Sequence, residues 1–147
     1  MELKFHGARR LTIHAWDALK GSKGRNSQGG LGGSRRDQCR NALPEMKTIE
    51  ALAKAFAERG IEDGVQVNSV SPGAIMTGRR LSMLEKAAAS KKITLEEAKR
   101  QFLKQAGISR FGEAEEIADV LAFVVSPAAR WMTGTVFRMD GGEVKSV

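Results

Sequence analysis

The chain has 147 residues, of which 41% are hydrophobic and 28% are charged. These values are ordinary for one globular domain, and no apolar run approaches the roughly 20 residues that cross a bilayer. A single cysteine, Cys39, excludes an internal disulfide, and His6 and His14 offer no zinc-ligand spacing, so we assign no metal site. Residues 1–16 never build the unbroken apolar stretch of a secretory signal, and we expect a cytoplasmic protein without a membrane partner. The sequence contains no tyrosine, which removes the phenol from the available acids and bases.

Most of the net charge of +7 lies in the first third of the chain. Residues 1–47 contain ten Lys or Arg and four Asp or Glu, whereas residues 48–147 contain fourteen and thirteen. Residues 20–40 hold six glycines and six Lys or Arg, and only two apolar side chains. Because such a stretch cannot bury a face, we expect residues 1–45 to form an atypical, basic, glycine-rich and disordered segment. Within it, the alternation at Leu11–Ala15 predicts at most a short strand.

From residue 46 onward the chain has the patterns of regular structure. Apolar residues recur at helical spacing from Ile49 to Phe56, and Gly60 offers a left-handed stop. The β-branched run Val65–Val70 then predicts a strand that ends at Pro72 and Gly73.

The remaining elements complete an alternation of helices and strands. Two charged helical stretches lie between Gly78 and Gly107, the second opened by a Thr94/Glu97 capping box. Acidic residues from Glu113 begin a further helix that ends before Pro127, and Thr133–Asp140 predicts a last strand. This order is typical of an open α/β sheet with right-handed crossovers.

Four segments of this second part resemble, in order and spacing, the C-terminal part of the short-chain dehydrogenase/reductase family. They are ALAKAFA at Ala51–Ala57, VQVNSVSPG at Val65–Gly73, RFGEAEEIA at Arg110–Ala118 and TGTVFRMDGG at Thr133–Gly142. The resemblance implies that residues 46–147 form the C-terminal portion of a Rossmann-type, doubly wound parallel sheet. It also implies that most of the dinucleotide-binding half of that fold is missing.

In that family the strand ending in Pro-Gly carries its loop to the nicotinamide end of NAD or NADP. The resemblance therefore implies a cofactor-binding loop, made of Pro72, Gly73, Ala74, Ile75 and Thr77. A cofactor in an open α/β sheet lies across the carboxyl ends of the strands, where glycine allows close backbone approach and free N–H groups can bond it. Taken alone, Ser71-Pro72-Gly73 would be only a turn that ends a strand.

Two motifs that the family's chemistry requires are absent. Residues 7–40 contain no Thr-Gly-x-x-x-Gly-x-Gly turn for the pyrophosphate, and the glycines at 29–33 favour a flexible linker. The family's Tyr-x-x-x-Lys would fall on Ala42 and Met46, and Lys47 is one position out of register, about 100° around a helix. We therefore assign no catalytic residue.

The sequence thus predicts an NAD(P)-dependent oxidoreductase by resemblance that is truncated or frameshifted and catalytically incompetent. One alternative is a non-catalytic oligomerisation partner, as a homo-oligomer or with an intact relative. The resemblance implies that the family's assembly contacts are retained in Phe56, Trp131 and the strand around Phe137. We expect the missing half to leave uncovered the outer edge of the 65–70 strand and the helix face with Ile49 and Phe56. Another alternative is nucleic-acid binding through the basic arm, although an unfolded, solvated segment is favoured there because no aromatic is interleaved.

Overall fold

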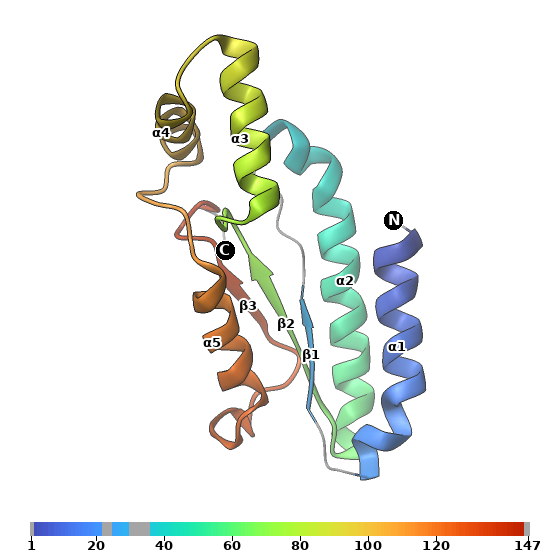
Figure 1. Ribbon diagram of the computed structural model, residues 1–147. Coiled ribbons are helices and arrows are strands. Elements are labelled where there is room, and N and C mark those ends of the chain that lie inside the picture. Colours follow the sequence, from blue (N-terminus) through green and yellow to red (C-terminus); the bar gives the residue numbers. More distant parts are fainter. Residues whose placement is uncertain (1, 22–24, 30–35, 146–147) are drawn as a thin grey trace.

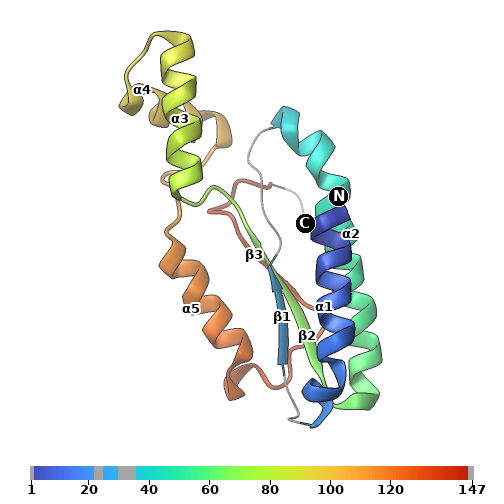
Figure 2. The same ribbon diagram turned by 45° about the vertical axis from the view of Figure 1, so that its right-hand side comes forward.

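The computed structural model describes residues 2–21, 25–29 and 36–145, with side chains from residues 5–21 and 47–145. In this part of the chain, a parallel sheet has the order β1 (Arg25–Gly29), β2 (Gln66–Pro72) and β3 (Val136–Met139). The helices α1 (Glu2–Gly21) and α2 (Arg36–Asp63) cover one face of the sheet, and α5 (Ala114–Val125) covers the other (Figures 1 and 2). The α/β class and the partial Rossmann-type sheet are therefore confirmed.

The helices α3 (Gly78–Lys91) and α4 (Leu95–Ala106) form a hairpin beyond the carboxyl ends of β2 and β3 (Figure 1). Thr94 caps α4, since its hydroxyl oxygen accepts a hydrogen bond from the Glu97 N–H at 3.2 Å. A short 3₁₀ helix, Pro127–Ala129, follows α5. None of the helices in the described ranges combines the length and apolar character that crossing a bilayer requires.

The central strand β2 is buried along most of its length because its two faces meet different layers. Val67 packs with Ala53 and Ala57 of α2 in one apolar cluster. On another side, the Asn68 amide donates to the Met132 carbonyl at 2.9 Å and accepts from the Thr135 N–H at 3.1 Å. These bonds fix the turn that precedes β3, so the sequence around Asn68 also sets where the last strand begins.

The end of α2 differs from its prediction. The helix continues past Gly60 to Asp63, and Gly64, with φ of +70°, is the residue in the left-handed conformation. Gly60 has another role: a Cβ there would lie 2.0 Å from the Val65 carbonyl oxygen. Its missing side chain lets the chain turn back against α2, and the Val65 N–H donates to the Gly60 carbonyl at 2.9 Å.

The first helix overturns the prediction of a disordered segment for residues 2–21. Leu11–Ala15 lies inside α1 rather than in a strand, because Phe5, Ala8, Thr12 and Trp16 recur at helical spacing and all face inward to some degree. Thr12 and Trp16 are both 3% exposed. The period-two alternation of five residues was too short a window to reveal this longer helical pattern.

Trp16 joins the two N-terminal helices. Its indole N–H donates to the Asp63 carboxylate at 2.6 Å, and its ring lies 5.4 Å from that of Phe56. The Arg59 guanidinium lies over the indole at 5.0 Å, and the Lys20 ammonium lies 2.8 Å from the Asp63 carboxylate. Hydrogen bonds from Lys20 and Trp16 lower the pKa of Asp63, so this carboxylate stays charged where it anchors α1.

The outer edge of β2 and the apolar face of α2 are covered by the chain itself, contrary to expectation. Strand β1 pairs in parallel with β2, from Arg25 opposite Gln66 to Gly29 opposite Val70. The described backbone at 25–29 is strand and that at 36–45 is helix. Residues 22–24 and 30–35 of the predicted segment lie outside the described residues. A backbone edge accepts a strand whatever its side chains are, so polarity alone was a poor guide.

We expect Trp16→Ala to lower the free energy of unfolding by about 3 kcal/mol, because it removes a buried aromatic side chain and leaves a cavity. Leu11→Ala in the same helix is the control, since Leu11 is 73% exposed and its loss should cost about 0.5 kcal/mol or less. Urea titrations followed by circular dichroism measure both. Equal effects of the two substitutions would show that α1 does not dock through Trp16.

Candidate functional site

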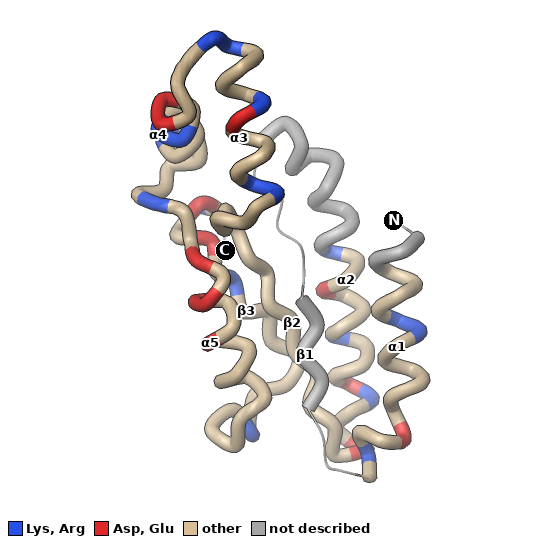
Figure 3. The backbone as a smooth tube through the Cα atoms, viewed as in Figure 1, with Lys and Arg blue, Asp and Glu red and all other residues tan. Residues whose placement is uncertain are grey.

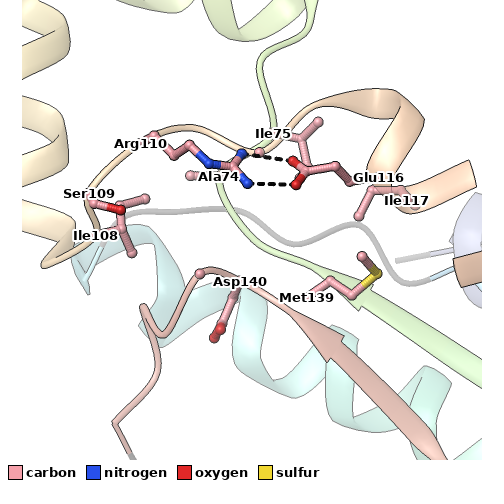
Figure 4. Close-up of a pocket in the computed structure, with 11 residues that line it drawn as sticks. Ala74, Ile75, Ile108, Ser109, Arg110, Glu116, Ile117, Met139 and Asp140 are labelled. Carbon is pink, nitrogen blue, oxygen red and sulfur yellow. Dashed lines mark hydrogen bonds and ion pairs between the residues drawn. The ribbon is translucent and has the colours of Figure 1, made fainter. Parts of the chain in front are cut away.

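A cavity of about 260 Å³ opens at the carboxyl ends of β2 and β3 (Figure 4). The β2–α3 loop contributes Ala74 and Ile75, and the α4–α5 loop contributes residues 108–110 and 112. Glu116 and Ile117 of α5 complete the wall, together with residues 139–141 at the end of β3. The carboxyl edge of a parallel sheet is where open α/β folds bind ligands, which makes this cavity the candidate site.

The backbone of the β2–α3 loop is held by its neighbours on two sides. The Gly73 N–H donates to the Met139 carbonyl at 2.9 Å, and a Cβ on Gly73 would lie 2.6 Å from the Cα and the Cβ of Asp140. The Met76 N–H donates to the Gly112 carbonyl at 2.8 Å, and the Gly112 N–H donates to the Ala74 carbonyl at 3.0 Å. The absence of a side chain at Gly73 therefore lets the segment at the end of β3 pack closely against the β2–α3 loop.

The five residues predicted to bind the cofactor occupy different places. Ala74 and Ile75 line the cavity, whereas Pro72 ends β2 opposite Met139 and Thr77 is exposed. The Thr77 hydroxyl oxygen accepts from the Arg80 N–H at 3.2 Å and so caps α3. These residues follow one another along a single loop, but only two of them share a cavity.

A bidentate ion pair crosses the rim of the cavity (Figure 4). The Arg110 guanidinium donates through Nη1 to Glu116 Oε2 at 2.8 Å and through Nη2 to Oε1 at 2.6 Å. Nη1 also donates to the Phe111 carbonyl, and the Glu113 N–H donates to Glu116 Oε2 at 2.8 Å. One carboxylate thus holds the α4–α5 loop and caps the start of α5.

This pair stays charged over a wide range of pH. Hydrogen bonds from Arg110 and from the Glu113 backbone lower the pKa of Glu116 to about 2. The hydrogen bond with Glu116 in turn raises the pKa of Arg110. A carboxyl whose pKa is lower in the folded state stabilises the fold above its unfolded pKa of about 4.3. That contribution is lost as the pH falls from there through about 2.

The sequence pattern placed Arg110 and Glu116 in one motif, and Glu116 in the acidic first turn of a helix, but it did not predict their ion pair. The available signal was the capping position: Glu116 lies three residues after Glu113, where a carboxylate reaches back to the backbone. The reach of Arg110 across the loop depends on a backbone path that no local pattern encodes.

The polar groups at this cavity are largely committed to holding the backbone. The Asp140 carboxylate accepts from the Gly142 N–H at 2.9 Å and from the Val144 N–H at 3.0 Å. Among the residues that the structure describes, no three His, Cys, Asp or Glu side chains gather as a metal site would require. Ala42 and Met46, at the register of the family's tyrosine and lysine, lie in the part of α2 whose side chains are outside the description.

Several hydrogen-bonding groups of the β2–α3 loop are used inside the protein. The N–H groups of Gly73 and Met76 donate to Met139 and Gly112, and the Ile75 N–H donates to the Gly73 carbonyl at 3.0 Å. With Thr77 capping α3, these groups already have partners within the protein. The binding role of the five residues stays a prediction.

We expect Gly73→Ala to lower the free energy of unfolding by about 2 kcal/mol, because the new methyl group overlaps the backbone of Asp140. Gly78→Ala is the matched control: a Cβ there meets nothing within 4 Å, and alanine in a helix should be neutral or slightly stabilising. Thermal unfolding compares the two variants with the parent chain. A fully stable Gly73→Ala protein would contradict the close packing of this loop on β3.

Comparison with known proteins gives this arrangement a family. Residues 43–143 match the family model described as "Enoyl-(Acyl carrier protein) reductase". An uncharacterized oxidoreductase of Bacillus subtilis, YvaG, is 33% identical over 106 residues, which are 69% of this chain and 40% of that protein. The 7alpha-hydroxysteroid dehydrogenase of Escherichia coli K12 is 31% identical over 86 residues, which are 58% of this chain and 30% of that enzyme.

Solved structures extend the likeness in fold to almost the whole chain. L-Sorbose reductase from Gluconobacter frateurii, complexed with NADPH and L-sorbose, superposes with a TM-score of 0.85 at 21% identity, over 99% of this chain and 57% of that one. A short-chain dehydrogenase family protein from Francisella tularensis gives a TM-score of 0.70 at 26% identity, over 92% and 58%. The chain thus spans less than two thirds of each of these relatives. Because the family model matches more than half of its residues, the chain belongs to the short-chain dehydrogenase/reductase family.

Proposed function

We propose that this polypeptide is a non-catalytic member of its family, which neither turns over substrate with NAD or NADP nor binds either dinucleotide tightly. The observation that carries the proposal is the absence of tyrosine from all 147 residues. The reaction that the family resemblance implies needs a phenol to give or take the alcohol proton while hydride moves to or from the nicotinamide. A neighbouring lysine ammonium lowers the pKa of that phenol. In this chain Ala42 stands at the position of the tyrosine and Met46 at the position of the lysine.

The geometry of the β2–α3 loop supports the same conclusion for binding. Its N–H groups at positions 73, 75 and 76 donate to protein carbonyls, and the Thr77 hydroxyl oxygen caps α3. A dinucleotide gains much of its hold from a glycine-rich turn at a helix N-terminus, which the sequence lacks. L-Sorbose reductase, whose structure is a complex with NADPH, has a chain almost twice as long as the part of it that superposes on this protein.

Titration calorimetry with NADH and with NADPH should give no saturable heat at micromolar ligand, because one loop cannot hold a dinucleotide. Incubation with NAD or NADP and a panel of secondary alcohols should give no reduced cofactor above a heat-denatured control. Saturable binding abolished by Thr77→Ala but retained in Ser82→Ala would contradict the proposal and assign the loop its family role.

The origin of the chain by frameshift or deletion upstream is part of this proposal. Support comes from the change of character near residue 45 and from a family match that begins at residue 43. A frameshift predicts that another reading frame of the coding DNA across codons 8–46 encodes a Tyr-x-x-x-Lys fragment or a Thr-Gly-x-x-x-Gly-x-Gly fragment. Translation of all three frames checks this, and two frames without either fragment would leave only deletion.

A second candidate function is assembly with another copy of this chain, or with an intact relative through the same surface. Four apolar side chains are exposed around the end of α5 and the start of β3: Phe123, Val125, Trp131 and Val136. Trp131 is 97% exposed, and the exposed apolar cluster borders a strand paired on one edge with β2. Phe56, by contrast, packs on Trp16 inside the chain, so it is not offered to a partner.

We expect the chain to sediment as a dimer at micromolar concentration and Trp131→Glu to shift it to monomer, because a carboxylate at the centre of an apolar contact loses its water. Ile61→Glu is the control, since Ile61 is 71% exposed on α2, away from this surface. A parent chain that stays monomeric at 100 micromolar, or equal dissociation by both substitutions, would contradict assembly through Trp131.

A further inference from the structure

Positive charge within the family-like part of the chain is concentrated on the α3–α4 hairpin. Residues 78–106 contain eight Lys or Arg and three Asp or Glu, whereas the other residues of 48–147 contain six and ten. Figure 3 shows the basic positions along the hairpin and acidic positions at the start of α5. The net charge of residues 48–147 is thus close to zero because a basic α3–α4 hairpin is balanced by an acidic remainder.

The two helices of the hairpin enclose a narrow groove of about 60 Å³. Its floor is apolar, made by Met83, Leu84 and Ala87 of α3 and Phe102 of α4. Leu84 is buried, and the other three are partly exposed. No Asp or Glu lines the groove, so its walls carry only neutral and basic side chains.

Basic side chains stand at both ends of the groove. The Arg80 guanidinium lies 5.0 Å from the centre of the Phe102 ring, which holds its charge at one end. At the other end, the Lys91 ammonium donates to the Gln101 side-chain oxygen at 3.2 Å. A neutral amide orients this ammonium without cancelling its charge.

The acidic residues of α4 are held by neighbours on their own helix. The Lys99 ammonium lies 2.7 Å from Glu96, and Arg100 forms an ion pair with Glu97. Gln101 also donates to Glu97. The third carboxylate of the hairpin, Glu85 of α3, does not line the groove, so basic side chains set its potential.

We propose that the α3–α4 groove docks an acidic amphipathic helix of a partner protein. Lys91 follows Arg80 by eleven positions on α3, a span of about 16 Å or three helical turns. A helix of that length would place apolar side chains at i and i+4 on Met83, Ala87 and Phe102. Its carboxylates would lie beside Arg80 at one end and Lys91 at the other. This inference needs neither cofactor binding nor self-association.

The test uses the full chain and a fluorescein-labelled 14-residue peptide with leucine at i, i+3, i+4 and i+7 and with glutamate and alanine elsewhere. Fluorescence anisotropy should show saturable binding that weakens as salt rises from 0.05 to 0.3 M. Lys91→Gln should weaken the affinity about fivefold, which is the upper range for one ion pair. Ala87→Glu, on the floor of the groove, should abolish binding while circular dichroism stays unchanged.

Lys86→Gln is the matched control, because it removes the same charge from α3 about 140° around the helix from Lys91. It should change the affinity less than twofold. Equal losses in Lys86→Gln and Lys91→Gln would overturn the proposal, since they would indicate general attraction to a basic hairpin. Equal binding of a peptide with serine in place of leucine, or tighter binding of a 14-nucleotide single strand, would overturn it as well.

Discussion

The burial of strand β2 between two parallel neighbours is the constraint on which the other features depend. A parallel strand presents N–H and C=O groups on both edges and side chains on both faces, and all of them need partners. Here β1 and β3 take the edges, and α2 packs against Val67. Pairing on both edges fixes the position of the carboxyl end of β2. The β2–α3 loop therefore begins at a defined place at the carboxyl edge of the sheet.

That loop is then fixed by contacts that leave it little freedom. Asp140 approaches so closely that only glycine fits at position 73, and the α4–α5 loop pairs with residues 74–76 through Gly112. The Arg110–Glu116 pair ties the same loop to the start of α5. The walls of the cavity at this edge are therefore held by backbone hydrogen bonds and by one bidentate ion pair.

In the N-terminal third, the backbone follows the fold of the relatives although its sequence differs from theirs. A chain whose family match begins at residue 43 still superposes over nearly its whole length on a relative at 21% identity. Trp16 supplies one buried ring and one hydrogen bond to Asp63, and those contacts dock α1 on α2. Strand β1 joins through main-chain pairing, which accepts a polar sequence such as RNSQG. Position in the fold can thus persist where the sequence does not match the family model.

The sequence by itself determined the elements after residue 46, because their signals are local. The apolar spacing of Ile49–Phe56, the β-branched run before Pro72 and the caps at Thr94 and Glu113 each depend on residues a few positions apart. It also determined that the chain contains no tyrosine, which is a fact of composition that no fold can change. Tertiary structure alone decided that α1 is a helix against α2 and that β1 covers the edge of β2. It alone brought Gly73 against Asp140 and Arg110 against Glu116, and aligned Arg80 and Lys91 along one groove. Each of these depends on contacts between segments whose meeting is set by packing, and no pattern within either segment encodes its partner.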